Sequence, residues 1–339
     1  MKKNYTITDL AIRLGISKST VSRALKDHPD VNMATRAKVK ALAEELNYQP
    51  NLLASGLASK KSYIIGVIVP EISQQHFFAK VLEGIQHEAK EQGYSVMICQ
   101  SDECFEEEVN QAQILRNNRA AGVLISLSRE TQSFKHIENL KNSGVPVVLF
   151  DRTVSELPVS QVVVDDYKGA FELTHYLLEK GYRDIAYLSG PMSLEISRHR
   201  YEGYLQALRD YDINTADSRV YECLKLSSDV KEAVRKMLLE PKHPEAIMCV
   251  HDYMAVEVVR YLKERNIQVP QDIAVTGFAG DPVTDIITPT ITTMKQPAYE
   301  MGRAATAQLI KEINAEDWDE VPAIKKVFDT VLQIKASTR

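Results

Sequence analysis

Beyond residue 62, short apolar runs alternate with amphipathic segments, and this alternation is what most limits the folds open to the chain. Such alternation is typical of parallel strands buried on both faces of a sheet, with helices between them. It predicts a doubly wound α/β construction, and about 270 residues of it would divide into two lobes. We expect strands at residues 64–69, 96–99, 122–127, 145–150, 185–189, 247–250 and 273–278.

The segment between the first two expected strands has a clear helical pattern. Residues 75–92 carry one apolar stripe that ends before Gly93, made of Phe78, Val81, Leu82, Ile85 and Ala89. In open α/β sheets, ligands bind outside the carboxyl ends of the strands. We therefore expect a small-molecule site between the two lobes.

The charge of the chain is divided unevenly. Residues 1–62 contain 11 Lys and Arg against 5 Asp and Glu, a balance of +6, whereas the remaining 30 basic and 41 acidic residues give −11. A basic N-terminal unit joined to an acidic body indicates that the first part alone meets phosphate. A solvated basic surface without a nucleic-acid partner is the alternative at this point.

The N-terminal unit carries the signals of three short helices. Thr6 and Asp9 form a capping-box pattern, Gly15 stands where a first helix would end, and Ser17 and Asn32 can cap the next two. The third helix is expected to close a small core with Ala37, Val39, Leu42, Ala43 and Leu46.

Two short helices joined by a glycine turn are typical of a helix-turn-helix. Val21, Ala24 and Leu25 share one face of the second helix, which leaves its polar residues outward. An arginine can bond bidentately to guanine, while hydroxyl groups suit both bases and phosphate. Base readout is therefore expected from Lys18, Ser19 and Arg23, although a helical bundle with a polar surface has the same periodicity.

A short apolar segment follows the helix breaker Pro50. Residues 50–59 are fewer than an isolated helix needs in water, and Gly56 weakens the helix further. The segment should fold only against a partner. A plain linker with leucines that face a core is the alternative.

These motifs together resemble the lactose/galactose repressor family of bacterial regulators. The resemblance rests here on residues 6–11, 21–23 and 46–51 and on the segment that bears Leu57. It implies a hinge helix that forms on operator DNA, with Leu57 as the wedge between base pairs. We expect DNA contacts from Thr6, Ser17, Lys18, Ser19, Thr20, Ser22, Arg23, Asn32, Thr35, Asn51, Ser55 and Leu57.

The resemblance continues through the body, at residues 65–70, 190–191, 200–204, 251–252, 275–278 and 289–293. It implies a two-lobed domain similar to periplasmic sugar-binding proteins. By position, the effector residues would be Ser73, Phe77, Phe78, Asp151, Arg200, His251 and Asp252.

One departure from the family pattern affects the ligand. Ala279 stands where the family commonly has an aspartate, so either Asp281 substitutes from a shifted loop or the effector lacks the group that the carboxylate would bind. We expect a carbohydrate or a derivative of one, and a modified or charged sugar rather than a simple hexose.

The sequence offers little for an enzyme of Rossmann-like fold, the rival interpretation. No G-x-G-x-x-G, G-x-S-x-G or Walker A motif occurs, and Cys99, Cys104, Cys223 and Cys249 lack metal-ligand spacing. No cofactor or metal is expected, and the cysteines are expected to be reduced. The start of the chain lacks a secretory signal and no apolar run is long enough for a membrane span, so we expect a cytoplasmic protein.

We therefore predict a homodimeric, ligand-responsive transcription regulator, most simply a repressor of a palindromic operator. Its expected domains are a DNA-binding unit at residues 1–49, a hinge at 50–62 and an effector-binding and dimerisation body at 63–339. The absence of leucine heptads near Arg339 favours a dimer over a tetramer.

Overall fold

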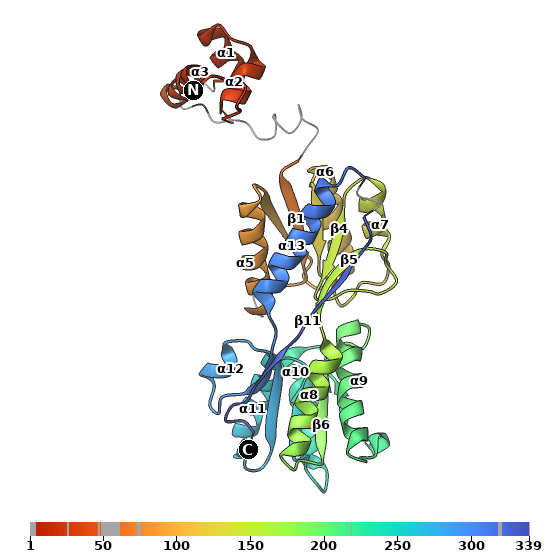
Figure 1. The fold of residues 1–339 in the computed structure, drawn as a ribbon. Coiled ribbons are helices and arrows are strands. Elements are labelled where there is room, and N and C mark those ends of the chain that lie inside the picture. Colours follow the sequence, from red (N-terminus) through yellow and green to blue (C-terminus); the bar gives the residue numbers. More distant parts are fainter. Residues whose placement is uncertain are drawn as a thin grey trace. The chain divides into compact units, whose positions relative to one another are not determined.

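The fold of the chain was obtained as a computed structural model, which describes residues 5–25, 27–46, 48, 62–72, 76–217, 219–317 and 321–338 (Figure 1). The chain divides into two units, Met1–Ser62 and Tyr63–Arg339. Each unit has its own hydrophobic core, so each is described by itself. The expected hinge residues 50–61 lie outside the described residues.

The first unit contains the three expected helices, α1 (Ile7–Leu14), α2 (Lys18–Leu25) and α3 (Met33–Glu45). The capping box is confirmed, because Asp9 N donates to Thr6 Oγ1 and Thr6 N donates to the Asp9 carboxylate at 2.7 Å. Gly15 ends α1 at φ 64°, a left-handed conformation that favours glycine.

The core of this unit is made where the three helices meet. Leu10, Val21, Ala24 and Val39 are buried. The expectation for Ala37 is wrong, because it lies on the exposed side of α3. A helix this short has room for one narrow apolar stripe, and Val39, Leu42, Ala43 and Leu46 already supply it.

The first lobe of the second unit contains a six-stranded sheet with the order β11-β5-β4-β3-β1-β2. All neighbouring strands are parallel, as the alternation predicts. The strands are β1 (Ile64–Val69), β2 (Ser95–Gln100), β3 (Gly122–Ile125), β4 (Val147–Phe150), β5 (Ser160–Val164) and β11 (Lys325–Phe328).

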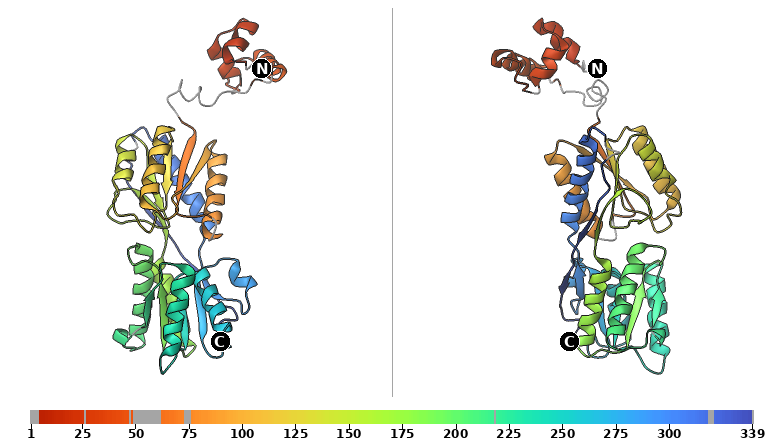
Figure 2. Two further views of the ribbon diagram at one scale, coloured as in Figure 1. Left: turned by 180° about the vertical axis from the view of Figure 1, so that it is seen from behind. Right: turned by 45° about the vertical axis from the view of Figure 1, so that its right-hand side comes forward.

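Helices cover both faces of this sheet (Figure 2). On one face α5 (His76–Glu91) packs against α13 (Ala298–Asn314), and on the other lie α6 (Phe105–Asn117) and α7 (Lys135–Asn142). Glycines let α5 and α13 touch backbone to backbone. A Cβ on Gly84 would lie 2.1 Å from Tyr299 O, and one on Gly302 would lie 2.1 Å from Val81 O.

The second lobe repeats the same design with a sheet of order β12-β10-β9-β8-β6-β7, in which only β12 is antiparallel. Its strands are β6 (Ile185–Ser189), β7 (Val220–Glu222), β8 (Ala246–Cys249), β9 (Ala274–Ala279), β10 (Thr292–Lys295) and β12 (Val331–Gln333). Its helices are α8 (Asp166–Glu179), α9 (Glu195–Asp210), α10 (Leu226–Leu239), α11 (Asp252–Lys263), the short α12 (Val283–Ile286) and the 3-10 turn Thr215–Asp217.

The chain passes between the lobes three times, after β5, after β10 and after β11 (Figure 1). The predicted two-lobed doubly wound fold is confirmed, and all seven expected strands are present. Several ends differ by one or two residues; β3 ends at Ile125 rather than 127, and β4 begins at Val147 rather than 145. None of the described helices combines the length and apolarity needed to cross a membrane.

Candidate functional site

The second helix of the first unit exposes a face of hydrogen-bond donors. Lys18, Ser19 and Arg23 are exposed, while Val21 and Ala24 on the opposite face are buried. Ser17 caps the helix, since Thr20 N donates to its hydroxyl at 3.1 Å. The outward face of α2 therefore carries two cationic side chains and a hydroxyl group.

The contacts of these side chains leave the cations available to a partner. Arg23 Nη1 lies 3.9 Å from Asp30 Oδ2 with both groups well exposed, and such surface pairs contribute little. Ser17 Oγ is hydrogen-bonded to Ser19 Oγ at 2.7 Å and to Thr20 Oγ1 at 2.8 Å. Their hydroxyls thus form one small cluster at the start of α2.

Of the remaining residues expected to contact DNA, some take part in helix caps and others lie outside the residues that the structure describes. Asn32 Oδ1 accepts from Thr35 N at 2.8 Å, so this pair caps α3. Thr6 is exposed while it caps α1, and Ser22 is half-buried. Asn51, Ser55 and Leu57, together with the effector residue Ser73, lie outside the residues that the structure describes.

In the second unit, polar residues directly follow the strands of the first lobe. Ser101 follows β2, Ser126 follows β3 and Asp151 follows β4, and all three are buried. The Ser101 and Ser126 hydroxyls have no hydrogen-bond partner among the described residues. Because parallel strands end at the same edge of a sheet, these groups gather at the edge where α/β proteins bind ligands.

Asp151 lines a cavity of about 360 Å³ to which both lobes contribute. Its backbone is left-handed at φ 57°, which an aspartate tolerates only where the surroundings hold it. The side chain is 7% exposed, and within the described part of the chain its carboxylate accepts no hydrogen bond. Burial raises the pKa of Asp151 to about 6, and Asp166 adds to the rise while Arg152 and Arg200 oppose it.

Arg200 is buried beside this cavity, where it joins four elements. Its Nε donates to Asp166 Oδ1 at 2.7 Å and its Nη1 donates to Val250 O at 2.6 Å. The guanidinium carbon lies 3.8 Å from the centroid of the Phe278 ring. Two donors of the arginine are thus engaged within the protein, and Asp166 neutralises its charge.

The second lobe contributes an acidic residue and a histidine at the start of α11. Asp252 accepts from Thr293 Oγ1 at 2.6 Å and from Asp281 N at 2.7 Å. Burial raises the pKa of Asp252 to about 6. His251 Nδ1 accepts from Met254 N, and burial, followed by the charges of Arg200 and Arg152, lowers the pKa of His251 to about 4. This histidine is therefore neutral at physiological pH.

Asp281 is held by contacts within its own loop and to the other lobe. Its Oδ1 accepts from Val283 N at 2.9 Å, and its Oδ2 accepts from His76 N at 3.0 Å. Ala279, at the departure from the family pattern, has φ 138°, which an L residue rarely adopts. The backbone therefore has an unusual conformation at Ala279, where the family commonly has an aspartate, and Asp281 makes an interlobe contact.

Phe77 and Phe78 belong to the hydrophobic core of the first lobe. They are 8% and 1% exposed, and their rings meet edge to face at a centroid separation of 5.3 Å. Helical periodicity alone favours this core role, whereas the resemblance implies an aromatic wall for the ligand. The structure brings Asp151 and Arg200 to the cavity region and buries the two phenylalanines in the adjoining core.

Residues that the sequence did not single out complete the interlobe region. Glu195, at the start of α9, accepts from Ser155 N at 3.0 Å and from Ser155 Oγ at 3.3 Å. Gln296 is buried between β10 and α13, and its Oε1 has no partner in the described part of the chain. The one available signal was position, since Ser101, Ser126 and Gln296 each follow a strand directly.

Comparisons with known proteins cover both units. Residues 6–51 match the family model for bacterial regulatory proteins of the lacI family, and residues 62–328 match the model for periplasmic binding proteins and the sugar-binding domain of the LacI family. Catabolite control protein A from Priestia megaterium is 33% identical over 317 residues, which cover 93% of this chain and 95% of the relative. The repressor CytR from Escherichia coli K12 is 30% identical over 334 residues, with coverage of 98% and 96%.

A solved structure extends the likeness to three dimensions. The lac repressor dimer bound to operator and the anti-inducer ONPF matches with a TM-score of 0.86 and 25% identity, over 99% of both chains. The resemblance seen in the sequence is thereby confirmed over nearly its whole length. The chain belongs to the LacI family of bacterial transcriptional regulators.

Proposed function

We propose that the chain is a ligand-responsive repressor that binds a palindromic operator as a homodimer in the cytoplasm, and that it is not an enzyme. The observation that carries the proposal is the exposed donor face of α2, within the segment that matches the family's regulatory model. The lac repressor structure is a dimer bound to operator, which supports the same mode of binding here. In this proposal residues 1–49 bind DNA, 50–62 form the hinge and 63–339 bind the effector and dimerise.

Arg23 is the residue best suited to read a base. Its guanidinium is exposed and weakly paired, and an arginine that bonds bidentately to guanine discriminates by about 1–3 kcal/mol against a wrong base. Lys18 and the Ser17, Ser19, Thr20 cluster suit phosphate oxygens as well as bases. Asn51, Ser55 and Leu57 remain proposed contacts from the family resemblance.

The proposal is tested by selecting genomic fragments on the full-length protein and measuring affinities by fluorescence anisotropy. Arg23→Ala should reduce the preference for selected over random duplex by about ten-fold or more. Arg13→Ala is the matched control, since it removes the same charge from the exposed side of α1. It should weaken both duplexes alike. Equal losses of preference in the two variants would remove Arg23 from base readout.

The cavity between the lobes is the proposed effector site, with Asp151 in its lining. Arg200, His251, Asp252 and Asp281 lie outside this lining and remain proposed effector residues from the family resemblance. The cavity volume of about 360 Å³ lies in the range of small-molecule sites. The carboxylate of Asp151 accepts no hydrogen bond from the described residues and offers its oxygens to ligand hydroxyls. The matched model describes a sugar-binding domain, which supports a carbohydrate or a derivative of one as the ligand.

The charges around the cavity favour a neutral, hydroxyl-rich ligand over an anionic one. Five carboxylates line the cavity, whereas Lys325 and His199 are its only described nitrogen bases. The nearby arginines are already paired, Arg200 with Asp166 and Arg152 with Glu103. A phosphate here would meet like charges without a free arginine among the described lining residues, so we propose a neutral sugar in place of the charged sugar expected from the sequence.

A thermal-shift screen should contain matched pairs, such as ribose with ribose 5-phosphate and glucose with glucose 6-phosphate. At equal concentration we expect the neutral member of a pair to raise the melting temperature more than its phosphate, because a ligand stabilises the native state more when its dissociation constant is lower. Calorimetry should then show weaker binding to Asp151→Asn. Asp210→Asn, at the exposed end of α9, is the control and should bind like wild type. A phosphorylated ligand that binds more tightly than its neutral partner would contradict the charge argument.

A further inference from the structure

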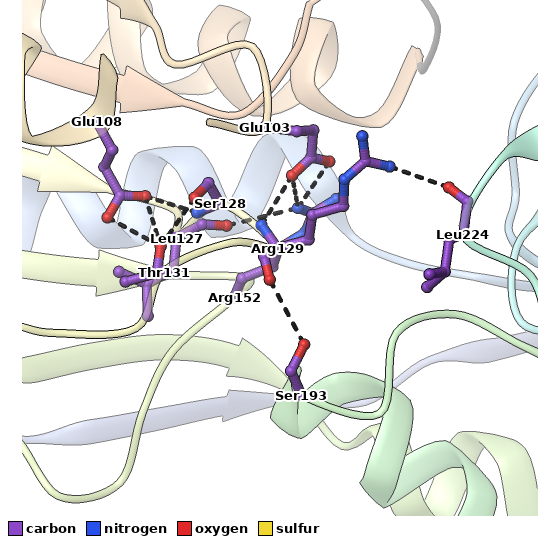
Figure 3. Close-up of polar contacts among 9 residues, drawn as sticks. All are labelled: Glu103, Glu108, Leu127, Ser128, Arg129, Thr131, Arg152, Ser193 and Leu224. Carbon is purple, nitrogen blue, oxygen red and sulfur yellow. Dashed lines mark hydrogen bonds and ion pairs between the residues drawn. The ribbon is translucent and has the colours of Figure 1, made fainter. Parts of the chain in front are cut away.

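Arg129 connects the two lobes from a position outside the effector cavity (Figure 3). It lies in the first lobe, in the loop after β3, and its Nη1 donates to Leu224 O of the second lobe at 3.0 Å. Its carbonyl oxygen accepts from Ser193 Oγ, also of the second lobe, at 3.5 Å. One exposed residue thus meets the second lobe through both its side chain and its backbone.

Two carboxylates fix the loop that presents Arg129. Glu103 Oε2 accepts from Arg129 N at 2.9 Å, and Glu108 Oε2 accepts from Ser128 N at 2.6 Å. Thr131 Oγ1 also donates to Glu108 at 3.0 Å. Residues 128–131 are therefore tied at three points to the start of α6, and Arg129 reaches the second lobe from a rigid base (Figure 3).

Glu103 is itself held by a nearly buried ion pair. Arg152 Nη1 lies 2.8 and 2.7 Å from the two Glu103 oxygens. Although burial opposes its ionisation, the Arg152 charge and the hydrogen bonds from Arg152 and from the Arg129 amide hold the pKa of Glu103 below its usual value. Asp102 and Glu103 are left-handed at φ 52° and 60°, a conformation that persists only where the surroundings hold it.

We propose that Arg129 is a positioning residue for the effector response, a latch that holds the lobes together and that Glu103 orients. The lobe contact stands independently of the proposed function; only its consequence for effector affinity rests on that proposal. Because Arg129 does not line the cavity, it acts on affinity through the population of the closed lobes. Because the contact is exposed to solvent, we expect it to shift that population by about two- to five-fold.

The test is the distance between the lobes of the full-length protein without ligand or DNA. Nitroxide labels on cysteines introduced at the exposed positions Asn139 in α7 and Lys236 in α10 report one lobe each. Cys104→Ser supplies the background, since the other three cysteines are buried. Labelled protein is diluted into excess unlabelled protein, so that double electron–electron resonance measures distances between two labels on the same chain.

We expect Arg129→Ala to move the distance distribution to longer and broader values, and Glu103→Gln to move it in the same direction. Arg129→Lys retains a donor and should restore part of the short distance. Arg116→Ala, which removes the same charge from α6, should match wild type. Because Arg129 is exposed, its loss does not threaten folding. A distribution for Arg129→Ala that coincides with that of wild type would overturn the latch, and it would leave the DNA-binding and effector proposals untouched.

Discussion

At the scale of single residues, Asp151 combines burial with a carboxylate that accepts no hydrogen bond from the described residues. Its pKa in the folded protein is about 6, raised chiefly by burial, against 3.8 as its ordinary value. The native state therefore holds a proton that the unfolded chain releases. The contribution of Asp151 to stability is greatest below pH 4 and is lost as the pH rises through 6. The difference between the two pKa values corresponds to a loss of about 3 kcal/mol in unfolding free energy.

Asp151→Asn should remove this loss. The variant should equal wild type in unfolding free energy below pH 4 and exceed it by up to about 3 kcal/mol above pH 7. Other groups also titrate in this range; His251, for example, contributes to stability with the opposite sign between pH 4 and 6.5. Because these groups are present in both proteins, the difference between the variant and wild type at each pH isolates Asp151. Urea unfolding followed by circular dichroism measures the difference. A constant offset over the whole pH range would show that Asp151 does not titrate there.

Arg200 is expected to stabilise the fold as well as the site. Arg200→Ala would leave Asp166 buried without its cation, and breaking a buried pair in this way costs about 3–5 kcal/mol. Arg198→Ala on the same helix is the control, since Arg198 is exposed, and its loss should cost under about 1 kcal/mol. Urea midpoints distinguish the two. A loss below about 1 kcal/mol for Arg200→Ala would show that the pair contributes little.

The family resemblance singles out Asp151 and Arg200 as expected effector residues, but no pattern in the sequence predicts which groups surround them. Arg200 and Asp166 are 34 positions apart, and no local pattern links them. The same holds for Glu103 and Arg152, which meet only after β1, β3 and β4 align. Such partners depend on tertiary packing, whereas caps such as Thr6 and Asn32 are read from neighbours in sequence.

At the scale of elements, periodicity predicted the buried strands and missed the others. The seven expected strands are nearly continuous apolar runs. The missed strands include β11 and β12, which are exposed and mixed in composition, and β7, which has three residues. β5 was missed although it is buried, because Ser160 and Gln161 interrupt its apolar run. An uninterrupted apolar run therefore identifies a strand even at the edge of a sheet, as in β2, whereas an interrupted run hides an internal strand such as β5.

The capping box of α1 offers a test at this scale. Thr6→Ala removes the hydroxyl acceptor of Asp9 N and should destabilise α1 by about 1 kcal/mol. Amide hydrogen exchange in α1 of the full-length protein should accelerate accordingly. Glu44→Ala, a change at an exposed position within α3, is the control and should leave α1 unaffected. Unchanged exchange in α1 after Thr6→Ala would mean that tertiary packing, rather than the cap, limits its opening.

At the scale of the whole molecule, the uneven charge predicts how DNA binding responds to salt. The first 62 residues carry +6 and the rest −11, so phosphate contacts should come from the first unit alone. Each neutralised phosphate releases counterions, and six or more contacts lower affinity on the order of a thousand-fold between about 50 and 200 mM salt. Anisotropy titrations over this range measure the slope. An affinity independent of salt would contradict binding through the basic unit.

The central claim is that ligand binding in the body changes the affinity of the first unit for DNA. The most direct measurement is the operator affinity of the full-length protein at fixed salt, with and without a saturating ligand from the thermal-shift screen. We expect a change of about 5- to 150-fold, and an equal change in ligand affinity when operator is bound. A ligand that saturates the cavity by calorimetry and leaves operator affinity unchanged would contradict the account.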